Sequence, residues 1–413
     1  MARRLAVPDF RFAALCLAGA AMPWSKAGLS IGMGLLILAS LAHAKPLKTI
    51  CTPMGAATAG LLVPLLISAL LSEDLARGWK EWTSFWPLLF PFLGAATIRD
   101  SARPHLFLSI LLCSTTAATI PLIQHLWENY ERYGDPLRRW FIPPTNIWLY
   151  TVSICTGAFV AWMRVLGSDH WRSRLSWAGV FLLHLAAILS TRRRMLILLA
   201  CAVLAWITTV VRPSGTTHRP MVLTAAVLAG LLVMANFVDP RLQEILQPDR
   251  VLQQEPTRPL MWSFAWDEFS DSPLLGTGLG DLRTRLHEFA DQEEARIEAE
   301  NLALPVDEQV HINLHHSHLH SNFLHTLAVA GLAGLAGLLS YLVVTARALV
   351  QGMRKCNLSA TLGWSAWALF FLGGVTDASL YSSSRLSAFT LVFAYAWGML
   401  LRPEPATSDA AID

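Results

Sequence analysis

The sequence is poor in charged residues and in cysteine. Only 15% of its 413 residues are charged, whereas roughly a quarter are charged in soluble proteins, and 54% are hydrophobic. Mean hydropathy is +0.44. This composition excludes an ordinary soluble protein and indicates an integral membrane protein, for which we expect no nucleic-acid partner. The six cysteines fall in apolar runs or short connections, so no disulfide framework is predicted.

Other features are missing as well. The apolar runs contain no central Asp, Glu or Lys, and no internal repeat is evident, both of which disfavour an ion-coupled carrier. No Cys-rich or HExxH element is present to bind a metal. GTGLG, the one glycine-rich turn, lacks the spacing and the strand-to-helix context of a dinucleotide fingerprint, which excludes nucleotide binding.

The sequence has apolar runs long enough to be transmembrane helices. A helix needs about 20 residues to cross the hydrocarbon core, and about twelve such runs follow one another. They lie near residues 10–24, 27–44, 56–72, 82–98, 106–127, 145–167, 177–191, 194–211, 220–238, 320–346, 359–380 and 385–401. Arg3 and Arg4 precede the first run, which we expect to be retained rather than cleaved. The predicted fold is an all-α polytopic membrane protein.

Basic residues in the short connections predict the orientation. Such residues are retained on the cytoplasmic side, and with the amino terminus inside they occupy nearly every alternate connection. The one long hydrophilic segment then faces the periplasm, if the host is a Gram-negative bacterium. We expect spans one to nine in residues 1–238, a periplasmic loop domain in 239–319, and spans ten to twelve with a cytoplasmic tail in 320–413.

Three consecutive arginines break this pattern. STRRRM, residues 190–195, links the predicted seventh and eighth spans and therefore faces the periplasm, as do Arg77 and Lys80. An ionisable cluster at membrane depth indicates a functional site with an anionic partner. If one span has been miscounted, the arginines are instead an ordinary cytoplasmic stop signal.

The long hydrophilic segment is predicted to be folded and mostly helical. Apolar residues recur at helical spacing after Arg258, and proline and glycines in residues 273–280 then predict a tight loop whose backbone can approach a ligand. The acidic stretch RTRLHEFADQEEARIEAENLAL that follows is predicted to be a solvated helix. Glu73 and Asp74, in another predicted periplasmic loop, are expected to be solvated too.

Histidines crowd the point where this segment re-enters the membrane. Five of the thirteen lie in HHSHLHSNFLHTLAVAGLAG, residues 315–334. Imidazole is suited to proton transfer near neutral pH, and so dense a group is also an alternative metal site. Because no second ligand set accompanies it, we expect no metal and no cofactor. His184 and His325, inside predicted spans, are expected to be packed, hydrogen-bonded helix residues.

Four motifs follow one another in the second half of the chain. They are TRRRML at the mouth of a span, TRPLMWSFAW, SPLLGTGLGDL and HSNFLHTLAVAGLAG. In this order and at these separations they resemble the Wzy and O-antigen-ligase membrane family. The resemblance covers chiefly residues 188–340, with a weaker likeness in GGVTDASLYSSSR. The chain length, the number of spans and the single large periplasmic loop resemble the ligase more than the polymerase.

The resemblance implies a metal-independent glycosyltransferase of the GT-C type in the bacterial inner membrane. It would transfer O-antigen polysaccharide from undecaprenyl diphosphate to a sugar hydroxyl of the lipid A core, at the periplasmic face. By the family match, Arg192 or Arg193, together with Arg258, would clamp the diphosphate, for which the planar guanidinium group is suited. His320 would deprotonate the acceptor hydroxyl as the general base.

Several alternatives stay open at the level of sequence. Ser321 stands where the family often has Asn, and His316 and His318 lie close enough to replace His320 as the base. A protonated histidine could serve the diphosphate instead. Asn322 is a candidate to orient the imidazole ring or a sugar hydroxyl. The alternative functions are an O-antigen polymerase that joins carrier-linked repeats and, from a different class, a secondary transporter.

Overall fold

Helices make up the described part of the chain. The computed structural model describes residues 7–41, 52–133, 147–168, 170–189, 257–303, 305, 314, 319–354, 358–376 and 378–402. No strand occurs in these residues, which confirms the predicted all-α class for them. In chain order the helices are α1 (Val7–Ala21), α2 (Lys26–Leu41), α4 (Pro53–Leu71), α5 (Leu75–Thr83), the 3-10 helix η1 (Trp86–Leu89), α6 (Phe90–Asp100), α7 (His105–Ala118), α8 (Ile120–Tyr133), α9 (Ile147–Gly167), α10 (Trp171–Leu189), α15 (Thr257–Asp271), α16 (Leu282–Asn301), α17 (Asn322–Arg354), α18 (Leu358–Thr376), the 3-10 helix η2 (Ser379–Tyr381) and α19 (Ser383–Leu400).

Many of the predicted spans correspond to apolar helices. Among the described residues, three helical stretches are long and apolar enough to cross a membrane by length and composition: Pro53–Leu71, His105–Tyr133, which comprises α7 and α8, and Asn322–Met353. Five shorter apolar helices are Phe10–Ala21, Lys26–Leu41, Leu149–Val165, Ser359–Val375 and Arg385–Leu400. The predicted spans at 194–211 and 220–238 lie outside the described residues. The total of about twelve therefore stays a prediction.

Prolines interrupt two of the predicted spans. The span expected at 82–98 is divided into the end of α5, η1 and α6, with Pro87 in η1 and Pro91 in the first turn of α6. The span expected at 106–127 is divided into α7 and α8, with Pro121 near the start of α8. Proline is tolerated in the first turn of a helix but breaks a helix interior, because it lacks an N–H and its ring clashes with the preceding turn.

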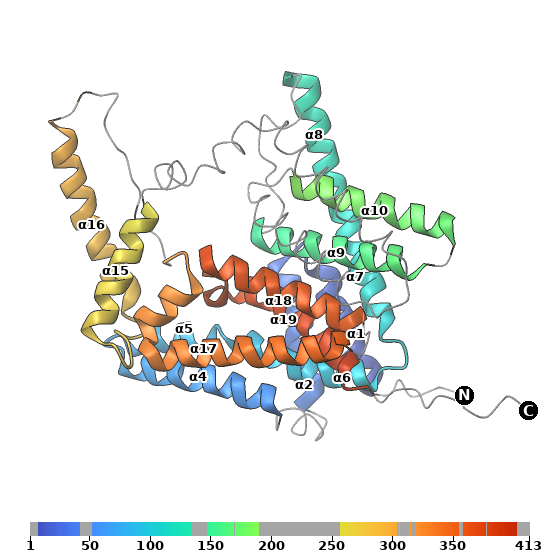
Figure 1. The fold of residues 1–413 in the computed structure, drawn as a ribbon, viewed down its shortest axis with the longest axis horizontal. Helices are drawn as coiled ribbons and strands as arrows, with labels where there is room; N and C mark the ends of the chain where they lie inside the picture. Colours follow the sequence, from blue (N-terminus) through green and yellow to red (C-terminus); the bar gives the residue numbers. More distant parts are fainter. Residues whose placement is uncertain are drawn as a thin grey trace, which may run out of the picture.

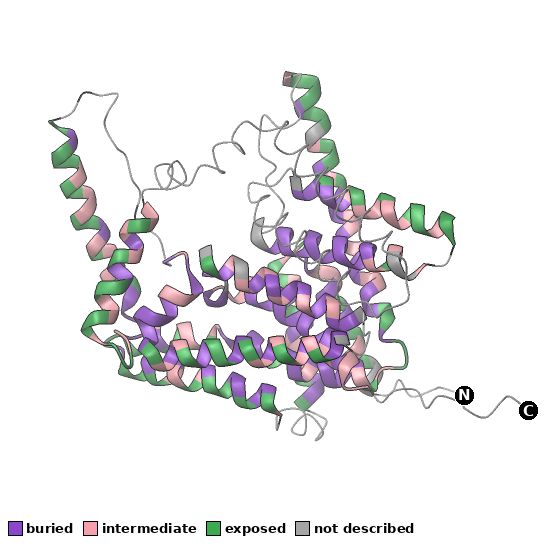
Figure 2. Ribbon diagram, viewed as in Figure 1, coloured by how far each residue is buried: buried purple, intermediate pink, exposed green. Residues whose placement is uncertain are grey.

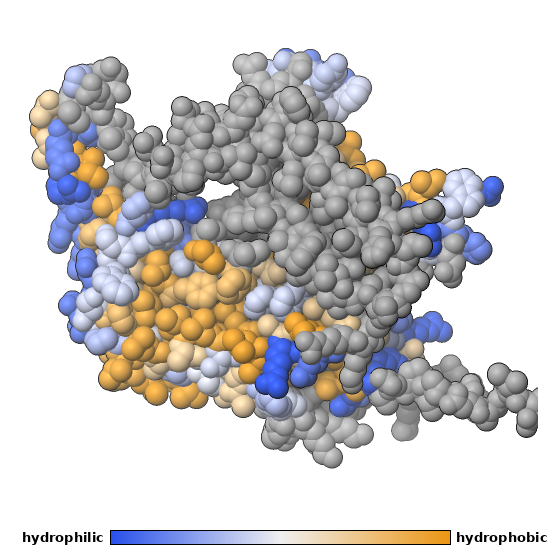
Figure 3. Space-filling model, in the orientation of Figure 1, coloured by the Kyte–Doolittle hydropathy of each residue, from blue (hydrophilic) through white to orange (hydrophobic). Residues whose placement is uncertain are grey.

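Helix α17 organises the packing near the proposed site. It packs along α4 and against α15 and α18, while α19 packs against α6 and α18 (Figure 1). The purple buried residues lie where these helices meet, and the outward faces of α4 and α17 are largely exposed (Figure 2). Those outward faces carry large hydrophobic side chains such as Leu70, Leu71, Leu339 and Val343. Figure 3 shows this hydrophobic face beside the hydrophilic α15 and α16.

Segments that the sequence predicts on the same side of the membrane meet in the structure. The guanidinium of Arg402 donates a hydrogen bond to the carbonyl oxygen of Ser101 at 3.0 Å, which joins two predicted cytoplasmic segments. The carboxylate of Asp281, in the predicted periplasmic loop, accepts hydrogen bonds from the N–H groups of Glu73 and Asp74 at 2.9 and 3.2 Å. These two contacts are compatible with the predicted alternation of loops, and the orientation stays a prediction.

Candidate functional site

The glycine-rich segment 272–281 docks into a break in α17. At Gly331 the backbone leaves the helical conformation, with φ of 58° and ψ of −156°. In a continuous helix each carbonyl oxygen accepts from the N–H four residues later. Because of the break, the carbonyl oxygens of Ala328 and Val329 and the N–H groups of Leu332 and Ala333 do not bond to one another and need other hydrogen-bond partners.

Segment 272–281 supplies those partners. The N–H groups of Leu332 and Ala333 donate to the carbonyl oxygens of Pro273 and Leu274 at 2.9 and 3.2 Å, and the N–H groups of Thr277 and Gly278 donate to the carbonyl oxygens of Ala328 and Val329 at 2.9 and 3.3 Å. From α4, the Ser68 hydroxyl also donates to the Val329 carbonyl oxygen. Backbone polar groups inside a membrane protein have to be satisfied within the protein, and this exchange satisfies them.

Two glycines make the docking possible. A Cβ at Gly276 would collide with the backbone of Val329 and Ala330, and a Cβ at Gly331 would collide with the backbone of Leu274. Both residues also have positive φ, which glycine adopts without a steric penalty. The tight glycine loop that the sequence predicted is therefore present, and its backbone closely approaches α17.

His320 lies at the entry of α17 in a left-handed backbone conformation. Its φ is 52°, and no other non-glycine residue in the described segments has a positive φ. The next residue caps the helix, because the Ser321 hydroxyl accepts a hydrogen bond from the N–H of Leu324 at 3.4 Å. Serine and asparagine are about equally good at this capping position. Ser321 therefore provides a cap that asparagine could also provide.

Asn322 links the start of α17 to the end of the chain. Its side chain is buried, and its side-chain oxygen Oδ1 accepts a hydrogen bond from the N–H of Leu380 in η2 at 2.8 Å. One turn later, the Thr326 hydroxyl donates to the backbone carbonyl oxygen of Asn322 at 2.6 Å. This hydrogen bond uses the only hydroxyl proton of Thr326. Tyr381 is therefore the donor in the 2.8 Å hydrogen bond between the two hydroxyl groups.

His325 lies in the first turn of α17 and has both a hydrogen bond and an aromatic contact. Its Nδ1 accepts a hydrogen bond from the N–H of Leu319 at 3.4 Å, so in the neutral ring the proton is on Nε2. The ring is buried and lies 3.9 Å, centroid to centroid, from the ring of Tyr381. His184 is likewise buried and hydrogen-bonded, with Nδ1 2.8 Å from the carbonyl oxygen of Val180, as the sequence predicted. His325 differs from it because it borders a cavity.

The cavity beside His325, which we call the polar cavity, has a volume of about 160 Å³. Leu279 and Leu282 form the apolar part of its wall. Its charged and polar lining is Arg77 and Glu81 from α5, Arg283 from the first turn of α16, His325 from α17 and Tyr381 from η2. At ~30 Å³ for each water molecule, it has room for about five. Because Arg283 is exposed and Arg77 partly so, the polar groups are within reach of solvent.

The cavity carries charges of both signs. Arg77 donates to the Thr284 hydroxyl at 2.6 Å, and its Nε lies 3.6 Å from the carboxylate of Asp74. Burial raises the pKa of Glu81, while the positive charges of Lys80, Arg283 and Arg77 act to lower it. The net shift is upward, so the low-dielectric surroundings outweigh the neighbouring cations.

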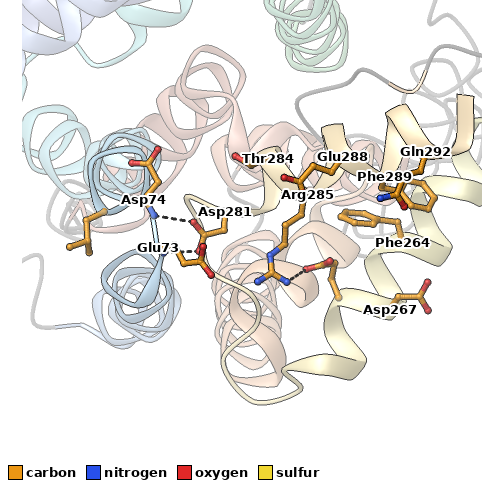
Figure 4. Close-up of a pocket in the computed structure, with 12 residues that line it drawn as sticks. Glu73, Asp74, Phe264, Asp267, Asp281, Thr284, Arg285, Glu288, Phe289 and Gln292 are labelled. Atoms are coloured by element: carbon orange, nitrogen blue, oxygen red, sulfur yellow. Dashed lines mark hydrogen bonds and ion pairs between the residues drawn. The ribbon is translucent and has the colours of Figure 1, made fainter. Parts of the chain in front are cut away.

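A larger and more open hollow lies nearby, between α15, α16 and the α4–α5 connection (Figure 4). It has a volume of about 890 Å³ and is predominantly acidic. Its charged lining consists of Glu73, Asp74, Asp267, Glu268, Asp281, Glu288 and Arg285. Several of these groups have structural partners: Asp74 caps α5, Asp281 binds backbone N–H groups, and Arg285 lies 3.3 Å from Glu268. So many carboxylates disfavour an anionic ligand in this hollow.

Within the described segments, no group of three or more His, Cys, Asp or Glu side chains lies close enough together to hold a metal ion. The two carboxylates that the sequence flagged, Glu73 and Asp74, are exposed, as predicted. The Asp74 side chain accepts a hydrogen bond from the N–H of Arg77 at 2.9 Å, so it caps α5.

Comparison with known proteins assigns this region to a family. Residues 172–339 match the family model described as O-Antigen ligase. The match shows that this stretch, which is less than half of the chain, is similar to that family. No curated protein matches the chain. The matched stretch runs from α10 to the middle of α17, so it includes segment 272–281, the histidine stretch and the break at Gly331.

The apolar helices indicate a membrane protein, and residues 172–339 are similar to the O-antigen ligase family. Of the residues that the sequence nominated, His320 and Asn322 stand at the entry of α17, and Arg258 is half-buried in the first turn of α15, which packs against α17. Arg258 does not line the polar cavity or the acidic hollow. The other nominated residues, Arg192, Arg193, His316 and His318, lie outside the described residues.

Sequence reasoning missed most of the polar cavity. Arg77 was noted as an excess cation on the predicted periplasmic face, but nothing connected it with Glu81, Arg283 or Tyr381. Arg283 belongs to a stretch whose charge pattern predicts a solvated helix, and Tyr381 lies in the weakly matching GGVTDASLYSSSR. These residues come together only through the tertiary packing of α5, α16, α17 and η2.

Proposed function

We propose that the protein is a lipid-linked glycosyltransferase, the O-antigen ligase itself. It transfers O-antigen polysaccharide from undecaprenyl diphosphate to a sugar hydroxyl of the lipid A core, at the periplasmic face of the inner membrane, without a metal ion or cofactor. The observation that carries the proposal is the family match over residues 172–339. This stretch includes each residue that the proposed mechanism uses.

In the proposed reaction, His320 accepts the proton of the acceptor hydroxyl as its oxygen attacks the anomeric carbon of the donor sugar. A new carbon–oxygen bond forms while the bond from that carbon to the diphosphate oxygen breaks. A single displacement of this kind inverts the configuration. Arg258, with Arg192 or Arg193, stabilises the negative charge on the departing diphosphate. His316, His318 and Asn322 are supporting residues in this mechanism.

The position of His320 suits this role. It precedes a capped helix and occupies a left-handed backbone conformation, a combination that restrains its main chain. The contacts between residues 73–74 and Asp281 support a common face for the predicted periplasmic segments.

Transfer in proteoliposomes would test the proposal, with purified carrier-linked polysaccharide as donor and lipid A-core as acceptor. The informative variant is His320→Asn, because asparagine tolerates positive φ and cannot act as a base, whereas His320→Ala adds backbone strain. We expect His320→Asn and Arg258→Ala to abolish transfer. The exposed Arg296→Ala on α16 is the matched control and should retain it.

Three results would contradict parts of this proposal. Full activity of His320→Asn or Arg258→Ala would reject that residue's role. Loss of transfer with EDTA, restored by a divalent cation, would reject metal independence. In a deletion strain, lipid A-core carrying a single repeat would indicate a polymerase, whereas free core with accumulated carrier-linked chains is the result expected for a ligase.

A further inference from the structure

We propose that the polar cavity beside His325 is a subsite for one sugar ring of a saccharide substrate, held through its hydroxyl groups. The inference rests on the proposed function, because that reaction brings saccharides to this face of the protein. It adds a site that the motifs do not contain, since Arg77, Glu81 and Tyr381 lie outside the family match.

The lining offers both hydrogen-bond donors and hydrogen-bond acceptors. Arg77 and Arg283 donate, whereas the carboxylate of Glu81 accepts. A sugar hydroxyl donates one hydrogen bond and accepts others, so adjacent hydroxyls on one ring can satisfy such a mixed set. The rings of His325 and Tyr381, which lie 3.9 Å apart, give the cavity an apolar surface for the C–H groups of a sugar.

Tyr381 adds a second acceptor. Its hydroxyl donates to Thr326, because the Thr326 hydroxyl already donates to the backbone carbonyl oxygen of Asn322. The remaining capacity of the tyrosine oxygen is therefore to accept a hydrogen bond. Among the polar groups of the cavity, Tyr381 and Glu81 can thus both accept a hydrogen bond from a donor on the ligand.

These two acceptors favour a sugar over a phosphate group. An ionised phosphate has acceptor oxygens and no hydrogen to donate, so it could not donate to the oxygen of Tyr381 and would repel the carboxylate of Glu81. Arg77 adds little attraction for a phosphate group, because it already has Asp74 and Thr284 as partners. A neutral ring with several hydroxyls satisfies both acceptors.

The cavity is next to the proposed reaction centre. The ring of His325 accepts a hydrogen bond from the N–H of Leu319, the residue immediately before His320. The backbone that leads into the proposed base is therefore hydrogen-bonded to a residue of the cavity lining, although His320 does not itself line the cavity. Either saccharide could supply the ring, the acceptor core or the donor chain, because both present hydroxyls at the reaction centre.

Direct binding to the full-length protein in nanodiscs tests the subsite. Lipid A-core and undecaprenyl-diphosphate-linked polysaccharide are titrated separately by microscale thermophoresis, with inorganic diphosphate as a third probe. We expect Glu81→Ala and Arg283→Ala each to weaken the binding of one saccharide at least ten-fold. Glu81→Gln should lose less, because the amide retains an acceptor oxygen. The saccharide that is weakened identifies the source of the ring.

The matched control is Arg296→Ala, an exposed cation on the same helix as Arg283, which should bind both saccharides as the wild type does. Arg283 is exposed, so its replacement keeps the test valid even if the Glu81 variants fold poorly. Unchanged affinity of Arg283→Ala for both saccharides would overturn the subsite, as would a wild type that binds neither. Binding of inorganic diphosphate that is lost in Arg283→Ala would also overturn it, in favour of an anion site.

These outcomes separate the subsite from the reaction. A protein that binds one saccharide through Glu81 and Arg283 but transfers nothing would contradict the proposed function and leave the subsite standing. A protein that transfers polysaccharide with unchanged affinities in both variants would support the function and reject the subsite.

Discussion

The side-chain carbonyl oxygen of Asn322 accepts a hydrogen bond from the backbone N–H of Leu380 at 2.8 Å. This bond fastens the histidine motif at the start of α17 to the 3-10 helix between α18 and α19. The sequence had nominated Asn322 for contact with a ring or a sugar hydroxyl. In the structure its carbonyl oxygen holds together two segments that border the polar cavity.

We expect Asn322→Ala to destabilise the protein. The substitution leaves the buried N–H of Leu380 without its acceptor, which costs about 1–3 kcal/mol in the free energy of unfolding. Denaturation of the purified protein by SDS titration would measure the change. Gln124→Ala, on the exposed face of α8, is the control and should alter stability by less than about 0.5 kcal/mol. Equal stability of the wild type and Asn322→Ala would show that the bond is unimportant.

Alanine at either glycine of the docked loop should be severely destabilising. Gly276→Ala and Gly331→Ala each place a Cβ against backbone atoms at a residue with positive φ, so strain and steric overlap add together. We expect a loss of roughly 3 kcal/mol or more, or a failure to accumulate folded protein. Gly34→Ala in α2 has open space around the new Cβ and should be neutral or stabilising by about 0.5–1 kcal/mol. Fluorescence-detected size-exclusion chromatography would rank the three variants, and equal yields would contradict the docking.

Substitutions at Ser321 test the helix cap. Ser321→Ala removes the acceptor for the N–H of Leu324, so we expect a loss of about 1 kcal/mol. Ser321→Asn should restore stability, because asparagine caps helices about as well and is the residue that the family often carries. Thermal unfolding in detergent would distinguish the two variants. A lower midpoint for Asn than for Ala would refute the capping role.

The two residues of the ion pair between Arg11 and Asp100 should differ in how much their replacement lowers the free energy of unfolding. The buried Arg11 side chain lies 3.6 Å from Asp100, which is about one-third exposed and also binds Arg99 at 2.9 Å. Asp100→Asn leaves a buried guanidinium without its carboxylate and should cost about 3 kcal/mol. Arg11→Met leaves a carboxylate that still has Arg99 and solvent, so its cost should be about 1 kcal/mol or less. SDS titration of both variants measures the difference, and the reverse order would contradict this account.

The raised pKa of Glu81 predicts a pH dependence of stability. Burial raises this pKa, so the folded protein binds the proton more tightly than the unfolded chain does. The stabilisation is complete below the unfolded pKa of about 4.3 and is lost as pH rises through the folded pKa. Glu81→Gln cannot ionise, so its melting temperature should exceed that of the wild type by a margin that grows as pH rises through that window.

Arg283→Ala supplies the companion measurement. Arg283 lowers the pKa of Glu81, so removing its charge should raise that pKa further and extend the pH-dependent loss of stability to higher pH. Thermal unfolding across the acidic to neutral range would follow both variants. A constant difference between Glu81→Gln and the wild type at every pH would show that Glu81 titrates alike in the folded and unfolded chains.

The helices were the part of the fold that the sequence predicted well. The expected spans at 56–72 and 385–401 correspond to Pro53–Leu71 and Ser383–Leu400, because a long apolar run in a membrane protein has few alternatives to helix. The interruptions were not predicted. Hydropathy averages over a window and does not register Pro87 or the break at Gly331, where the backbone changes direction.

The candidate site was predictable only in part. Glycine at 276 signals that something comes close to the backbone, but the pattern does not say whether a ligand or another helix does so. The cavity was out of reach for a related reason: Glu81 and Arg283 lie about two hundred positions apart, and no local periodicity relates them. His320 was nominated from the sequence because it belongs to a motif. Its left-handed backbone conformation is visible only in the structure.

The bent helix α17 is completed by a segment that precedes it in the chain. Residues 272–281 leave the ribosome before residues 322–354, so the strip of backbone that fills the gap at Gly331 has already been made when the helix forms. A bilayer offers no water to the exposed groups at that gap. The order of synthesis therefore provides the template first and the helix that needs it second.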